Sequence, residues 1–74
     1  MNAAEALKEV QRELPMAVEL ATPAKHGAST VYPVKFSGRV ADISLPMIVE
    51  SSGTARIVMA LTPEWFLLLK LFAA

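Results

Sequence analysis

The chain has 74 residues, no cysteine, and seven basic against seven acidic side chains, so its formal net charge is zero at neutral pH. This length predicts a single domain spanning residues 1–74, and the lack of cysteine excludes disulfides and thiolate metal sites. The charge balance disfavours a strongly acidic DNA-mimicking inhibitor and, equally, a strongly basic face for nucleic acid.

The chain is more apolar than an average soluble domain. Hydrophobic residues make up 54% of it, and the mean hydropathy is +0.44. A domain this small buries only about 60% of its extended surface, so apolar burial barely offsets the loss of chain entropy. Because disulfides are excluded, association is the remaining way to bury the excess. We therefore expect a protein partner, with a homodimer as the expected form of self-association.

Residues 3–14 are predicted to form an amphipathic helix. Asn2 is a good N-cap, and Glu5 stands three residues later, as in a capping box. Apolar side chains recur at helical spacing and make one stripe: Ala3, Leu7, Val10 and Leu14. Pro15 should end this helix, because proline lacks an amide hydrogen and its ring collides with the preceding turn.

The next part of the chain is predicted to be largely extended. Residues 16–21 alternate in the manner of a strand, although Pro15 would also suit the first turn of a second short helix; we favour the strand. Residues 22–29 contain proline and glycine but no large apolar side chain, which indicates a loop. Residues 30–44 are rich in β-branched and aromatic side chains, which favour strands.

Two apolar runs, 47–50 and 55–61, are predicted to form a hairpin, since the residues between them include a glycine that accepts a positive backbone φ. Thr62 as N-cap and Pro63 in the first turn then predict a final helix. The predicted fold class is therefore α+β: a small antiparallel sheet of three to four strands, flanked by an N-terminal and a C-terminal helix.

The C-terminal helix is the most informative feature of the sequence. Residues 65–72 are apolar around nearly the whole helix, and only Glu64 and Lys70 mark a polar side. A helix that is apolar all round is normally buried all round, yet one helix can cover a small sheet with one side only. Aromatic residues are typical anchors of protein interfaces. We therefore predict a partner-binding surface made of Trp65, Phe66, Leu69 and Phe72.

No pattern in the sequence is typical of a catalytic site. His26 is the one histidine, no glycine-rich phosphate loop is present, and the spacing of Glu5, Glu9 and Glu13 is typical of a solvated helix face. We accordingly predict no catalytic residue, no metal ligand and no cofactor, and expect that the protein is not an enzyme.

The sequence thus favours a non-enzymatic protein-interaction module of the adaptor, assembly-factor or inhibitor type, which self-associates or docks on a larger protein through its C-terminal helix. No run approaches the length of a transmembrane helix and no export signal is evident, so a cytoplasmic location is expected. An enzyme subunit that supplies only an interface is a further hypothesis. The main alternative is a small nucleic-acid-binding module, whose basic and aromatic residues would be Lys25, Tyr32, Lys35, Phe36 and Arg39.

Overall fold

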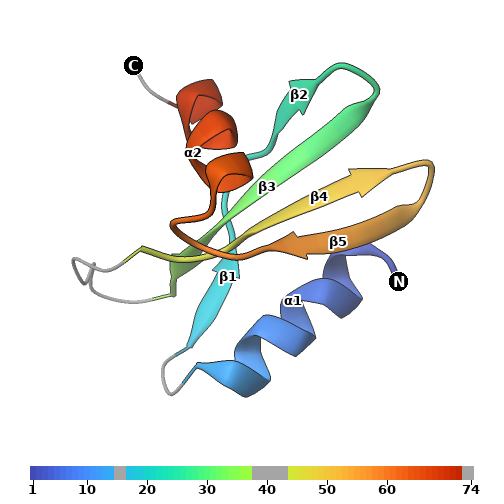
Figure 1. Ribbon diagram of the computed structural model, residues 1–74. Coiled ribbons are helices and arrows are strands. Elements are labelled where there is room, and N and C mark those ends of the chain that lie inside the picture. Colours follow the sequence, from blue (N-terminus) through green and yellow to red (C-terminus); the bar gives the residue numbers. More distant parts are fainter. Residues whose placement is uncertain (15–16, 38–43, 73–74) are drawn as a thin grey trace.

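A computed structural model describes residues 1–14, 17–37 and 44–72 of the chain. Within these residues, five strands form an antiparallel sheet, and helices α1 and α2 lie on its opposite faces (Figure 1). The α+β class is confirmed, with five strands where three to four were expected. In chain order the elements are α1 (Ala3–Glu13), β1 (Val18–Leu20), β2 (Ala24–His26), β3 (Ser29–Phe36), β4 (Met47–Ser51), β5 (Thr54–Val58), α2 (Pro63–Leu69) and the 3-10 helix η1 (Lys70–Phe72).

The long strand β3 organises the sheet. β4 pairs with one edge of β3, and β5 pairs with the far edge of β4. β1 and β2 both pair with the other edge of β3. β2 pairs with the first half of β3, where His26 lies opposite Ser29, and β1 pairs with the second half, where Val18 lies opposite Phe36. The strand favoured for residues 16–21 is present over Val18–Leu20, as β1, and Met16 lies outside the described residues.

Two tight turns set the register of the hairpins. Between β4 and β5, Ser52 and Gly53 both have positive φ angles, 52° and 79°, as a type I′ turn requires. Gly27, with a φ of 62°, begins the turn between β2 and β3. The hairpin predicted from residue 47 onward is confirmed, but β5 ends at Val58 and does not run to residue 61.

The prediction that residues 22–29 form a loop is wrong, because this segment contains β2 and the turn into β3. β2 consists of an alanine, a lysine and a histidine, none of them a strong strand former. Its extended conformation depends on pairing with β3 across the turn at Gly27, and that pairing is a tertiary effect which composition does not reveal.

Helix α1 begins with the predicted capping box. The Asn2 side chain accepts a hydrogen bond from the Glu5 amide at 2.9 Å, and the Glu5 side chain accepts one from the Asn2 amide at 2.9 Å. A carboxylate oxygen of Glu50 on β4 accepts a further bond from the Ala3 amide at 3.0 Å. A negative charge suits the positive end of a helix dipole, so Glu50 fastens the start of α1 to the sheet. The helix ends at Glu13, and Pro15, predicted to stop it, lies outside the described residues.

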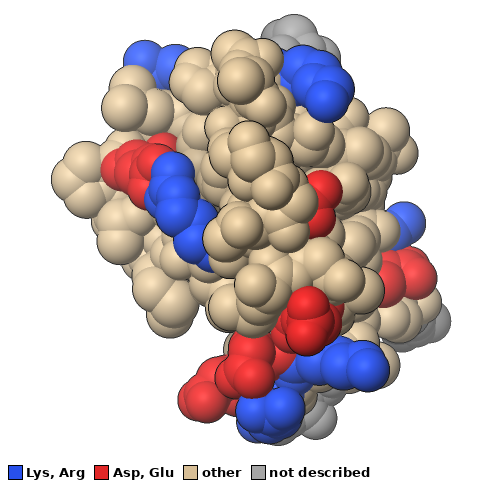
Figure 2. All heavy atoms as spheres, turned by 90° about the vertical axis from the view of Figure 1, so that its right-hand side faces the viewer, with Lys and Arg blue, Asp and Glu red and all other residues tan. Residues whose placement is uncertain are grey.

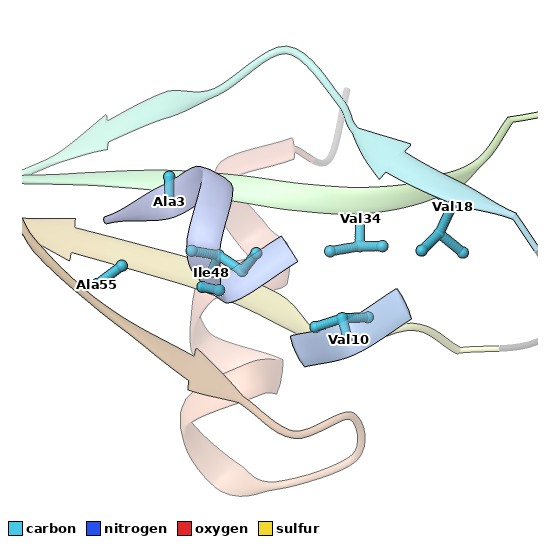
Figure 3. Close-up of a cluster of buried hydrophobic side chains, with 7 residues drawn as sticks. Ala3, Val10, Val18, Val34, Ile48 and Ala55 are labelled. Carbon is cyan, nitrogen blue, oxygen red and sulfur yellow. The ribbon is translucent and has the colours of Figure 1, made fainter. Parts of the chain in front are cut away.

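The sheet separates two hydrophobic clusters, because successive side chains of a strand point to opposite faces. The α1-side cluster is Ala3, Ala6, Val10, Val18, Val34, Ile48 and Ala55, with Ile48 fully buried among them (Figure 3). The α2-side cluster is Val31, Met47, Val49, Val58, Trp65 and Leu68. Each helix thus covers its own face of the sheet, and α2 does so with a single side.

Candidate protein-interaction surface

Helix α2 is fixed at its N-terminus by the cap that the sequence predicts. The Thr62 hydroxyl accepts a hydrogen bond from the Trp65 amide at 3.3 Å and donates one to the Met59 carbonyl at 2.9 Å, and Pro63 takes the first helical position. This arrangement ties the helix to the segment that leaves β5. The start and the direction of α2 are therefore set by local interactions.

Trp65 attaches α2 to the core. It is only 7% exposed, it belongs to the α2-side cluster, and its indole Nε1 donates a hydrogen bond to the Leu45 carbonyl at 2.8 Å. Leu68, one turn further on, is buried beside it. Trp65 and Leu68 define the inner side of α2, so the residues between and opposite them point away from the sheet.

The outer side of α2 carries large apolar side chains. Phe66 is 50% exposed, Leu67 is 64% exposed and Leu69 is 41% exposed. Of the four residues predicted to meet a partner, the structure therefore places Phe66 and Leu69 at the surface, Trp65 in the core, and Phe72 half-buried against the α2-side cluster. The prediction did not include Leu67. Leu67 can be assigned to the outer side only when Trp65 and Leu68 are known to face inward.

Two more exposed apolar residues lie just before α2. Met59 is 63% exposed and Leu61 is 64% exposed, since the strand expected to contain them ends at Val58. Leu61 also has a φ of 69°, a backbone conformation that is unusual for a leucine. Leu61 and Phe66 occupy the two positions of a hydrophobic staple around the Thr62 cap. The chain leading into α2 thus exposes two further large apolar side chains.

We refer to these five residues as the outer apolar surface: Met59, Leu61, Phe66, Leu67 and Leu69. If each has a total area of about 200 Å², as large side chains do, their exposed fractions amount to roughly 550 Å². The largest apolar patch on an ordinary monomer is about 300–600 Å² and is often functional. The summed exposed area of these five side chains therefore lies within the range of the largest apolar patches on ordinary monomers.

Charged groups border this surface. Both terminal nitrogens of Arg56 on β5 donate to the carboxylate of Glu64 on α2, one bond measuring 2.6 Å. The hydrogen bond to Arg56, followed by the attraction of its charge, lowers the pKa of Glu64, and the same bond raises the pKa of Arg56. On the face seen in Figure 2, basic and acidic side chains adjoin at the left and at the bottom, whereas the basic groups at the top have no acidic group beside them. That face therefore carries no large region of a single sign.

The residues of the nucleic-acid alternative are not gathered on one face. Tyr32 and Phe36 are half-buried against the α1-side cluster, whereas Lys35 lies on the other face of β3 and pairs with Glu19 at 3.6 Å. Lys25 donates to the Thr30 hydroxyl at 2.8 Å, near the other end of β3. Arg39 lies outside the described residues. The four residues that can be placed do not form a basic and aromatic platform.

A shallow pocket of about 250 Å³ opens between α1 and the edge of the sheet. Five apolar residues and two glutamates line it: Glu9, Val10, Glu13, Leu14, Pro46, Ile57 and Met59. The Glu9 carboxylate already pairs with Arg12 at 2.8 Å. Met59 belongs both to this pocket and to the outer apolar surface, so the two features adjoin.

Within residues 1–14, 17–37 and 44–72, no three histidine or acidic side chains come together in a way that would hold a metal ion. Over the same residues, no helix is both long and apolar enough to cross a membrane.

Comparison with known proteins gives no relative: no protein-family model matches the chain, and no curated protein or solved structure matches it significantly.

Proposed function

We propose that this protein is a non-enzymatic protein-interaction module, of the adaptor, assembly-factor or inhibitor type, and that it binds its partner through the outer apolar surface. The observation that carries the proposal is the division of α2 into two sides. Trp65 and Leu68 satisfy the contact with the sheet, while Phe66 and Leu67 remain exposed on the same helix. Large apolar side chains that the fold itself leaves uncovered are typical of interface centres.

The surface is also preformed, which supports binding without a large ordering cost. The Trp65–Leu45 hydrogen bond holds the inner side of α2, the Arg56–Glu64 pair holds its N-terminal turn against β5, and the Thr62 cap fixes its start. Rigid binding elements lose less conformational entropy when they bind than mobile ones do. The helix can therefore present its outer side to a partner in the geometry it already has.

The proposal is tested with three forms of the protein as immobilised baits: wild type, Leu67→Glu, and Ala4→Glu as the control. Both substitutions add one negative charge at an exposed helical position, but only the first lies on the outer apolar surface. Each bait is exposed to host-cell extract that also contains the untagged chain, and the strongest binders are remeasured as purified proteins. Binding that is retained by Ala4→Glu and weakened at least about tenfold by Leu67→Glu is expected. Equal binding to all three baits would contradict the proposal.

A further inference from the structure

We propose that the free edge of β5 binds an extended segment of another polypeptide, which pairs with the backbone of Ile57 and places a lysine or arginine side chain in the pocket beside α1. This binding site is separate from the outer apolar surface, except that Met59 belongs to both. Three features support it: the position of β5 in the sheet, the direction of its backbone groups and the lining of the pocket.

β5 is an edge strand. In the part of the chain that the structure describes, β5 pairs with β4 on one side and with no strand on the other, and α1 runs beneath it (Figure 1). The backbone amides and carbonyls along a strand edge can pair with a further strand. Several peptide-binding domains recognise their ligands in this way.

The register of the β4–β5 hairpin shows which groups of β5 point outward. Ser51 and Thr54 lie opposite each other across the two-residue turn, so they exchange hydrogen bonds. Bonded and non-bonded positions alternate along an antiparallel pair, and the amides of Ala55 and Ile57 therefore point away from β4. The Ala55 amide confirms this direction, because it donates to the Met1 carbonyl at 2.6 Å.

The N-terminal segment covers this edge at Ala55 and leaves it open at Ile57. Among residues 1–14, 17–37 and 44–72, no backbone group pairs with Ile57 on the side away from β4. Its amide and carbonyl can thus bond to an added segment without displacing a contact of the described fold.

A side chain of the added segment that lies level with Ile57 would enter the pocket beside α1. Side chains directly opposite each other on paired strands share a face of the sheet. Ile57 packs against the α1-side cluster and lines the pocket. The level position of the added segment is therefore the one whose side chain the pocket selects.

The pocket fits a long side chain with an apolar stem and a positive end. Five of its seven lining residues are apolar, and the other two are Glu9 and Glu13 on α1. Glu9 already pairs with Arg12, whereas Glu13 has no ion pair within the described residues. Lysine and arginine lay their methylene stems on apolar surface and keep the charged end in water. The exposed Glu13 carboxylate is thus the partner expected for the cation.

The test uses a short synthetic peptide that alternates threonine and valine around one central lysine, with both ends blocked so that the lysine carries the only charge. A second peptide has norleucine in place of lysine, which keeps the stem and lacks the charge. In titration calorimetry, wild type should bind the lysine peptide about two- to fivefold more tightly, as for an exposed ion pair. Glu13→Gln should lose most of this preference. Glu19→Gln, which removes the same charge at the opposite edge of the sheet, should keep it.

Amide hydrogen exchange tests the backbone pairing. With the lysine peptide bound at saturation, the Ile57 amide should exchange with solvent at least about tenfold more slowly than in the free protein, because it gains a hydrogen-bond acceptor. The Ala55 amide is the internal control, since it is already bonded to Met1 and should change much less.

Each of four results would overturn the inference. They are no binding of the lysine peptide at millimolar concentration, the same preference for lysine in wild type and Glu13→Gln, unchanged exchange of the Ile57 amide in the saturated complex, and loss of peptide binding in Leu67→Glu. The last result would place the peptide on the outer apolar surface. Leu67-dependent capture of a protein from cell extract is independent of these measurements, so the proposed function and the β5 site can fail separately.

Discussion

Trp65 and Phe66 are adjacent aromatic residues with opposite roles. Their rings meet edge to face, with centroids 5.1 Å apart, but the indole is buried and hydrogen-bonded whereas half of the phenylalanine is open to solvent. From the sequence alone, the two residues are equally strong candidates for the partner-binding surface. Burial decides between them, so their substitution should affect different properties of the protein.

We expect Trp65→Ala to lower the free energy of unfolding by about 3–5 kcal/mol, because it removes a large side chain from the core. Phe66→Ala should lower it by less than about 1 kcal/mol, since the side chain is half exposed. Urea denaturation at low protein concentration measures both. If Trp65→Ala does not fold, Trp65→Phe provides the comparison, with an expected loss of about 1–2 kcal/mol for the missing bond to Leu45. Equal losses for Trp65→Phe and Phe66→Ala would contradict the division of α2 into inner and outer sides.

Leu61 combines an exposed apolar side chain with a positive φ angle. The left-handed conformation costs a residue with a Cβ atom about 1–2 kcal/mol, and glycine adopts it freely. Leu61→Gly should therefore be more stable to urea than Leu61→Ala by about 1 kcal/mol, although both lack the same side chain. Both variants should bind the partner more weakly than wild type. A Leu61→Gly variant less stable than Leu61→Ala would show that the backbone strain has been misjudged.

At the scale of elements, the Arg56–Glu64 pair is the charged connection between β5 and α2. Each side chain is about half exposed, so the pair contributes at most about 1 kcal/mol. Its pH dependence follows from the lowered pKa of Glu64 in the folded state. A lowered pKa adds stability that is present above the unfolded value, near 4.5, and is lost as the pH falls through the folded value.

We therefore expect wild type to be more stable than Glu64→Gln at pH 7 by up to about 1 kcal/mol. This difference should shrink below pH 4.5 and nearly vanish once both the folded and the unfolded forms of Glu64 are protonated. Urea unfolding of both proteins between pH 7 and pH 2.5 measures it. Arg56 stays charged throughout this range, so it adds no pH dependence of its own to the free energy of unfolding. A difference that grows as the pH falls would contradict the assignment.

The elements that sequence predicts well are those specified by neighbouring residues. The Asn2–Glu5 capping box, the Ser52-Gly53 turn and the Thr62-Pro63 helix start all depend on side chains within four positions of one another. β2 was missed because its pairing with β3, and not its composition, makes it extended. The spacing of residues 65–72 likewise could not show which side of α2 faces the sheet, since apolar residues surround the helix. That choice is made by packing against Val31, Met47 and Val58.

At the scale of the whole molecule, the excess of apolar residues does not come from a loosely packed chain. The radius of gyration is 11.5 Å, close to the roughly 11.3 Å of a compact domain of this length. Within the described residues, no buried side-chain polar atom lacks a hydrogen-bond partner. Within the described residues the buried polar groups are thus satisfied, while large apolar side chains on the outer side of α2 remain exposed.

If a second copy covers the outer apolar surface, stability should depend on protein concentration, because binding that is specific to the folded state stabilises that state. Above the dissociation constant, a tenfold increase in concentration should add about 0.7 kcal/mol per chain and raise the thermal midpoint by about 3–5 °C. Leu67→Glu should have a midpoint that does not change with concentration, and Ala4→Glu should behave as wild type. Scanning calorimetry over two decades of concentration measures the effect. A wild-type midpoint independent of concentration would contradict self-association.

The sheet separates the core into two clusters, and mutations in one cluster should have effects separate from those in the other. The α1-side and α2-side clusters have no residue in common, and substitutions at separated sites usually add without coupling. Changes on the outer side of α2 can therefore accumulate while α1, its cap and its half of the core keep the chain folded. Such a scaffold can acquire a new binding partner one residue at a time, so recognition can evolve along one helix independently of the ability to fold.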